Sequence, residues 1–263
     1  MLKKLLKYDL KKIYKFLIIF YILAIFFAVL TRLFFLIDNS FVMSIIAKIC
    51  SGATIAMIAN IIINNIMRLW VKFKNALYDD ESYLTHTLPV TKKEIYLSKI
   101  ISSILTMITS VVAIIITLFI AYYSKENISN FKSFLLPVAN LLDSSIIGII
   151  FLFLLVLLIE SLNIIQVGYT GIILGHRINN NKVALSVIFG FIVYLATQTL
   201  SLFSAFIISL FNKDLVNLFI TNEVANVEMI KILGFICILI YGIIFIINLF
   251  INIKLFNKGV NVS

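Results

Sequence analysis

A single carboxylate lies deep in an apolar segment of this chain, at Glu160 within residues 144 to 175. An ionised side chain at the centre of a bilayer costs about 2.5–3.5 kcal/mol or more, so a membrane would require Glu160 to be paired, hydrated or protonated. Other polar residues follow at helical spacing in this segment and in the next apolar segment: Asn163, Gln166, Thr170, Tyr194, Thr197, Gln198 and Ser201. Together with Glu160 they form a candidate translocation path. The alternative is that Glu160 is a protonated, hydrogen-bonded structural group.

The residue types do not indicate enzymatic or metal chemistry. His86 and His176 have no ligand pattern around them, and Cys50 and Cys237 both fall within apolar segments. No apolar segment holds paired carboxylates or a nucleophile beside a base. No glycine precedes Lys-Ser or Lys-Thr in a phosphate-binding loop, so the chain has no ATPase motif of its own. We therefore expect no catalytic, cofactor-binding or metal-binding residue in this chain.

The composition is that of a membrane protein. Hydrophobic residues make up 62% of the chain, against about 45–50% in soluble proteins. Apolar runs of about 20 residues predict membrane-spanning helices, because only a helix satisfies its own backbone hydrogen bonds within lipid. Six such runs occur, at residues 16 to 37, 42 to 67, 100 to 123, 144 to 175, 183 to 210 and 232 to 253. The predicted fold class is an all-α polytopic membrane protein with six transmembrane helices. The fourth run is long for one crossing, and we expect one long, tilted or locally broken helix there.

The basic residues set the expected orientation. The formal net charge is +10, from 22 Lys and Arg against 12 Asp and Glu. Placing the N-terminus inside leaves only six basic residues outside: Arg32, Lys48, Lys125, Lys132, Lys213 and Lys231. Because cytoplasmic loops carry the excess of Lys and Arg, both termini are predicted to be cytoplasmic. The structure of the outer segments, 124 to 143 and 211 to 231, is left open.

Residues 1 to 15 are predicted to form an interfacial amphipathic helix that precedes a transmembrane domain at residues 16 to 263. Leucines and Ile13 fall on one side of this helix, and six lysines lie on the other side or at its margins. The lysines would meet an anionic leaflet while the leucines enter the acyl boundary. Asp9 is on the apolar side, either as a protein contact or as a tolerated polar residue.

The segment from residue 68 to residue 98 is the one long polar interruption between two predicted spans. Thr91 and Glu94 have the spacing of a capping box, which predicts a helix that starts at Lys92 and continues into the third span. Pro89 ends any helix that approaches from the other side, so "THTLP" is predicted to be a turn after a helical piece from Leu69 to about Leu84. Two interpretations remain open: a solvated helical hairpin, or a preorganised docking surface for a soluble partner.

The sequence "DDESYLTHTLPVTKKEIYLSKI" resembles the coupling helix region in permease subunits of type-2 ABC exporters. The matching positions are Glu81, Leu84, Leu88, Pro89, Thr91, Lys93, Glu94, Ile95 and Lys99. The glycines at 168, 171 and 175 also look like the end of the fourth helix in that family. The basic amphipathic arm, the six spans and the inner termini match the family in outline only.

This resemblance implies that a separate ATP-binding subunit docks on the cytoplasmic segment. The residues it assigns to docking are Tyr78, Asp80, Glu81, Leu84, Leu88, Pro89 and Glu94. ATP and Mg²⁺ would belong to that partner, and a second permease would complete a homodimer or heterodimer. The implied function is export of a peptide, drug-like or lipid-like substrate through a multi-pass protein of the cell membrane, in this family the bacterial cytoplasmic membrane. The alternative hypothesis is an ion- or proton-coupled secondary transporter that uses Glu160.

Overall fold

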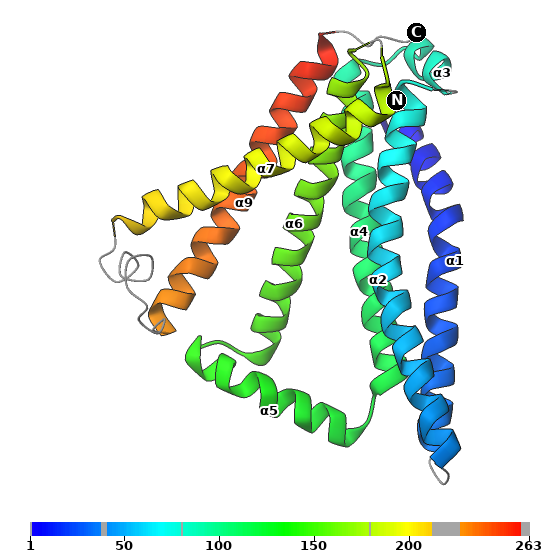
Figure 1. The fold of residues 1–263 in the computed structure, drawn as a ribbon, viewed down its shortest axis with the longest axis vertical. Coiled ribbons are helices and arrows are strands. Elements are labelled where there is room, and N and C mark those ends of the chain that lie inside the picture. Colours follow the sequence, from blue (N-terminus) through cyan, green and yellow to red (C-terminus); the bar gives the residue numbers. More distant parts are fainter. Residues whose placement is uncertain (1, 38–40, 80, 179, 212–226, 259–263) are drawn as a thin grey trace. The chain divides into compact units, whose positions relative to one another are not determined.

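The computed structural model describes residues 2–37, 41–79, 81–178, 180–211 and 227–258, and this part of the chain is helical without strands (Figure 1). The helices are α1 (Leu2–Leu36), α2 (Phe41–Leu77), α3 (Ser82–Thr87), α4 (Lys92–Tyr122), α5 (Lys125–Leu141), α6 (Ile146–Gly175), α7 (Lys182–Ser209) and α9 (Val227–Asn257). Among the described residues, 6 helices are long and apolar enough to cross a membrane. The predicted multi-pass, all-α fold is thereby confirmed. The cytoplasmic termini stay a prediction.

Residues 1 to 15 are not separated from the first span by a helix boundary. α1 is one helix of 35 residues from Leu2 to Leu36, and at about 1.5 Å per residue its length exceeds a hydrocarbon core of about 30 Å. Its first turns therefore project beyond the apolar segment as a basic extension. That these turns lie in the membrane interface stays a prediction.

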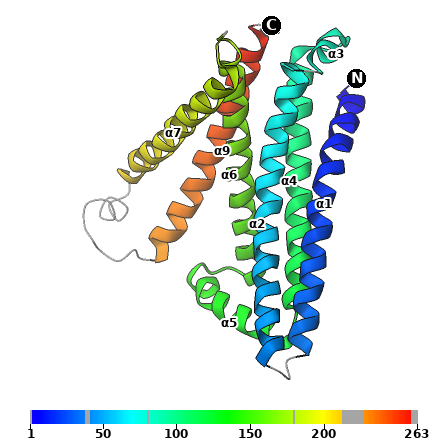
Figure 2. The ribbon, with the colours of Figure 1, turned by 45° about the vertical axis from the view of Figure 1, so that its right-hand side comes forward.

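The chain divides into two compact units, and each is described here by itself. The first unit comprises Met1–Phe73 and Pro89–Ser133. Within it α1 packs along α4 (Figure 2), and hydroxyl pairs connect them, such as Tyr21 with Ser110 at 2.8 Å. α2 joins this pair through buried polar contacts. One example is the bond from Asn65 Nδ2 to Ser110 Oγ at 2.8 Å.

The second unit comprises Lys74–Leu88 and Phe134–Ser263, and it holds α3, α6, α7 and α9. α6 packs against both α7 and α9. Gly171 and Gly175 lie at the contact with α7, where an added Cβ on Gly171 would meet the carbonyl oxygen of Ser186 at 2.6 Å. The absence of a side chain allows the two backbones to approach closely.

Two local predictions, and the outer segments that were left open, can be compared with the described helices. α6 is continuous over 30 residues, so the long fourth run is a single helix. The outer segment after the third span contains α5, which includes Pro137. Most of the other outer segment, residues 212–226, lies outside the described residues. The prediction of a helix to Leu84 followed by a "THTLP" turn was wrong, because α2 ends at Leu77 and Ser82–Thr87 form the separate helix α3.

Candidate functional site

The turn between α3 and α4 has the geometry that the capping signals predicted. Thr91 Oγ1 accepts a hydrogen bond from the backbone N–H of Glu94 at 3.3 Å. Glu94 Oε2 accepts one from the backbone N–H of Thr91 at 2.9 Å. These reciprocal bonds satisfy two donors at the start of α4. Leu88 is extended, with φ −66° and ψ 140°, as the following Pro89 requires. The end of α3 is therefore defined by local chemistry.

The helix α3 presents apolar side chains to the outside. Tyr83 is 77% exposed, Leu84 is 65% exposed and Leu88 is 44% exposed. We call these three residues the α3 tip. The opposite face is buried at Ser82 and Thr85, and Thr85 Oγ1 donates within the helix to the carbonyl of Glu81 at 2.9 Å. A short helix with one buried face and one exposed apolar face would lose little conformational entropy if a partner bound to it.

Two aromatic side chains, Tyr78 after α2 and His86 in α3, contact the ends of α6 and α9 within the second unit. Tyr78 stacks on His176, with the ring centroids 4.3 Å apart and the ring planes at 31°. His86 lies against Phe256 with a centroid distance of 6.3 Å. The Nε2–H of His86 also donates to the carbonyl of Leu77 at 3.2 Å. These contacts link residues far apart in the sequence: α3 contacts α9 through His86, and Tyr78, which follows α2, contacts the end of α6.

Burial controls the electrostatics of this aromatic contact. Burial raises the pKa of the Tyr78 phenol, while the nearby positive charge of Arg177 acts in the opposite direction. Burial also lowers the pKa of His176, partly opposed by the hydrogen bond that its Nδ1–H donates to the carbonyl of Ile172 at 2.9 Å. Both rings are therefore held in their neutral forms near pH 7. A charged pair lies beside them, because Lys74 Nζ and Asp79 Oδ2 are 2.8 Å apart.

The structure distributes the predicted docking residues over three environments. Leu84, Leu88 and Pro89 are exposed, whereas Tyr78 is half-buried against His176. Glu94 belongs to the capping box and Glu81 precedes α3 as its half-buried N-terminal neighbour. Asp80 lies outside the described residues. The prediction did not name Tyr83, the most exposed of the α3 tip residues. The sequence feature that could have identified Tyr83 is its position beside Leu84 and close to an acidic run.

The polar residues after Glu160 on α6 hydrogen-bond to α9. Asn163 Nδ2 donates to the carbonyl of Tyr241 and Gln166 Nε2 to that of Phe245, both at 3.0 Å. Thr170 Oγ1 donates to Asn252 Oδ1 at 2.8 Å. Side-chain amides that bond across two helices hold a membrane bundle together. These three predicted path residues thus form one contact between α6 and α9.

The other predicted path residues, Glu160 on α6 and four residues on α7, have different surroundings. Glu160 is half-buried and forms no hydrogen bond or ion pair with another described side chain. On α7, Gln198 Oε1 accepts from the Tyr241 hydroxyl at 3.1 Å. Thr197 and Ser201 bond to carbonyls of their own helix, and Tyr194 is partly exposed. Of the predicted path residues, only those facing α9 are brought together.

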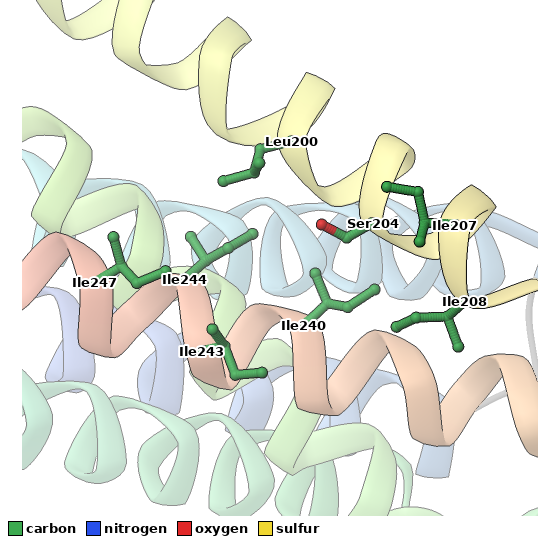
Figure 3. Close-up of a pocket in the computed structure, with 8 residues that line it drawn as sticks. All are labelled: Leu200, Ser204, Ile207, Ile208, Ile240, Ile243, Ile244 and Ile247. Atoms are coloured by element: carbon green, nitrogen blue, oxygen red, sulfur yellow. The ribbon is translucent and has the colours of Figure 1, made fainter.

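A cavity of about 360 Å³ lies between α7 and α9 (Figure 3). Its lining consists of Leu200, Ser204, Ile207, Ile208, Ile240, Ile243, Ile244 and Ile247. Among these side chains only Ser204 carries a polar atom, which is labelled in Figure 3. The lining holds no charged group, so it offers a space for an apolar group and no site for an ion.

The position of Asp9 on the apolar side of α1 has a structural explanation. Its carboxylate accepts hydrogen bonds from Lys99 Nζ at 2.7 and 2.8 Å, and from Ser98 Oγ at 3.0 Å. Asp9 is 1% exposed and Lys99 is 4% exposed. The sequence indicated that Asp9 was unusual, but it did not identify Lys99 as the partner. A buried pair of this kind holds the first turns of α1 against the first turns of α4.

Comparison of the chain with protein-family models, with characterised proteins and with solved structures found no match. The assignment of function therefore depends on the chemistry and geometry described above, together with the local resemblance of the α3 region to a coupling segment.

Proposed function

We propose that this chain is the permease subunit of an ATP-driven exporter and that a separate ATP-binding subunit docks on the α3 tip. The observation that carries the proposal is the exposed α3 tip, in which Tyr83 and Leu84 are 77% and 65% exposed on a helix whose other face is buried. Apolar and aromatic side chains that protrude from a preorganised element are typical anchors of a protein interface.

The contacts of α3 within the second unit support a role in transmission. A partner that pushes on the tip acts on the Tyr78–His176 stack and on the His86–Phe256 contact. His176 follows the last residue of α6, and Phe256 is next to the last residue of α9. Force applied to the tip therefore has a direct route to two spanning helices. The exported substrate would be apolar in part, since the cavity between α7 and α9 is aliphatic.

The proposal is tested by purifying the tagged chain from its own host in mild detergent and identifying its companions by mass spectrometry. We expect a phosphate-loop ATPase in stoichiometric amount. Leu84→Glu places a charge at the centre of the tip, and Ile178→Glu is the matched control because Ile178 is also an exposed aliphatic residue of the second unit, 42% exposed. The ATPase should be lost with the first variant and retained with the control.

Purification of an intact chain without any ATPase would refute the proposal. The alternative of a proton-coupled carrier would then be tested directly, because Glu160 has no ionic partner among the described residues. Transport into vesicles driven by a proton gradient and abolished by Glu160→Gln would support that alternative. An ATPase that co-purifies equally with both variants would place its contact elsewhere on the chain.

A further inference from the structure

The helix α5 has an apolar side and a polar side. At about 100° per residue, the apolar side of α5 consists of Ile128, Phe131, Phe134, Leu135, Val138 and Ala139. The opposite side includes Lys125, Ser129, Lys132, Ser133 and Asn140, with Leu136 and Pro137 as apolar exceptions. Phe131 is 53% exposed and Phe134 is 74% exposed, so the two largest side chains of the apolar side protrude from the chain.

The start of α5 is fixed at the end of α4. Tyr123 and Ser124 separate the last residue of α4, Tyr122, from the first residue of α5. Ser124 Oγ accepts a hydrogen bond from the backbone N–H of Asn127 at 3.0 Å, which caps the new helix. Asn127 Nδ2 donates to the carbonyl of Tyr122 at 2.9 Å. This bond ties α5 to the end of α4, and it engages the polar side chain that interrupts the apolar side of α5.

The other end of α5 is closed by a turn of the Schellman type. Asp143 has a φ of 42°, in the left-handed region. The N–H of Ser144 donates to the carbonyl of Ala139 at 3.0 Å, and the N–H of Asp143 donates to that of Asn140 at 3.3 Å. Ser145 then caps α6. Residues 142 to 145 are the whole connection from α5 to α6, so this end is also held close to a spanning helix.

These short connections fix the level of α5 in a membrane. A chain that crosses along α4 and returns along α6 leaves and re-enters the bilayer at one face. The apolar runs of these helices end at residue 123 and begin at residue 144, so both ends of α5 lie where hydrocarbon gives way to headgroups. A helix of 17 residues is about 25 Å long, and with both ends at one level its axis lies along the membrane surface. Tyr122 and Tyr123 agree with this level, where tyrosine is enriched.

We propose that α5 binds the lipid surface, with its apolar side inserted into the acyl boundary and its lysines directed to the headgroups and water. Apolar residues on one side and lysines on the other are typical of helices that lie in this interface. The two spanning helices deliver Phe131 and Phe134 to the lipid boundary, which favours lipid over a protein partner. On the predicted orientation this surface is the outer leaflet. The proposal requires only that α4 and α6 cross a membrane, and it is independent of the exporter function.

The test is electron paramagnetic resonance of the full chain in phosphatidylcholine vesicles, with both native cysteines replaced by serine and one nitroxide-labelled cysteine introduced at a time. The labelled variants are Phe131→Cys and Phe134→Cys, with Ser129→Cys and Ser133→Cys as matched controls on the opposite side. All four positions are exposed in the chain, so we expect the substitutions to leave the fold intact. The labels at 131 and 134 should be reached by dissolved oxygen and should lose access to a water-soluble nickel chelate present on both sides of the bilayer. The labels at 129 and 133 should be reached by the chelate.

Two patterns of accessibility would overturn the proposal. Access of the nickel chelate to all four positions would place α5 in water. Exclusion of both oxygen and nickel from positions 131 and 134 would show that protein covers the apolar side, and spin–spin broadening that disappears on mixing with unlabelled chain would identify that protein as a second copy.

A second pair of variants tests insertion without labelling either phenylalanine. With the nitroxide at Val138, which is 38% exposed on the apolar side, Phe131→Asp should raise nickel access by placing a charge in the acyl boundary. Ser129→Asp, with the same label, adds the same charge on the opposite side and should leave nickel access unchanged. Equal effects of the two aspartates, or no effect of either, would contradict insertion of the apolar side.

Discussion

Replacing Asp9 by Asn removes one charge from a buried ion pair and keeps the size of the side chain. In the folded protein Asp9 and Lys99 have side-chain exposures of 1% and 5%, with Nζ and Oδ1 2.7 Å apart. The Asn variant leaves the ammonium of Lys99 buried without its counter-charge. Breaking such a pair from one side costs about 3–5 kcal/mol, because the remaining charge has lost both water and partner.

A second ion pair in the same protein supplies the matched control. Lys74 Nζ and Asp79 Oδ2 are 2.8 Å apart, which is nearly the same distance, but the side-chain exposures are 30% and 35%. An exposed pair is screened by water, so Asp79→Asn should cost about 1 kcal/mol or less. The two substitutions have the same chemistry and differ in burial. The ratio of their effects therefore measures the contribution of burial.

The assay is thermal unfolding in detergent, supported by a double-mutant cycle with Lys99→Met. Asp9→Asn should lower Tm by on the order of 10 °C, since 1 kcal/mol corresponds to about 2–4 °C in a chain of this size. The double variant Asp9→Asn/Lys99→Met should recover most of this loss, because no charge is left buried. Equal losses for Asp9→Asn and Asp79→Asn, or no recovery in the double variant, would refute the buried pair.

Three further predictions concern single sites. The pKa of His176 is lowered by burial, so its contribution to stability is complete above the ordinary value of about 6.5 and is lost as pH falls through the lowered pKa. His176→Asn should therefore reduce the loss of Tm on acidification from pH 8 to pH 5, and an unchanged pH profile would contradict this. Gly171→Ala should lower the free energy of unfolding by about 1–3 kcal/mol through overpacking, because its Cβ would meet the backbone of Gly190 at 2.7 Å. The control Gly52→Ala, whose Cβ would have no atom within 4 Å, should leave Tm unchanged or slightly raised, and equal shifts in the two variants would argue against the close α6–α7 contact. Thr91→Ala removes the capping box and should cost about 1 kcal/mol in unfolding free energy, and an unchanged Tm would show that the cap is not needed.

Much of the fold could be predicted from the sequence, because its strongest signals act locally. Apolar runs of sufficient length are helical in lipid, and the six predicted spans correspond to the 6 long apolar helices. The capping box at Thr91 was also predicted, since both partners are within four positions of each other. The helix α3 was missed because Pro89 indicates where a helix stops and says nothing about the break after Leu77, where α2 ends, and before Ser82, where α3 begins. That break depends on backbone bonds such as Glu81 N–H to the Asn75 carbonyl at 3.1 Å.

The contacts that organise the candidate site depend on tertiary packing, so the sequence could not specify them. Tyr78 and His176 come together only because α6 ends beside the residue that follows α2 within the second unit. The residues Asn163 and Gln166 were recognised as a polar stripe, but their bonds to α9 backbone carbonyls could not be read from residue types. A polar stripe has the same sequence pattern whether it lines water or joins two helices.

The most direct measurement of the central claim is photo-crosslinking from the α3 tip in intact cells. A benzophenone amino acid replaces Tyr83, which is 77% exposed, and in a control it replaces Phe41, which is 82% exposed at the other end of α2. We predict an adduct between position 83 and a phosphate-loop ATPase, and no such adduct from position 41. An absence of the ATPase adduct from position 83, or equal adducts from both positions, would contradict docking on the α3 tip.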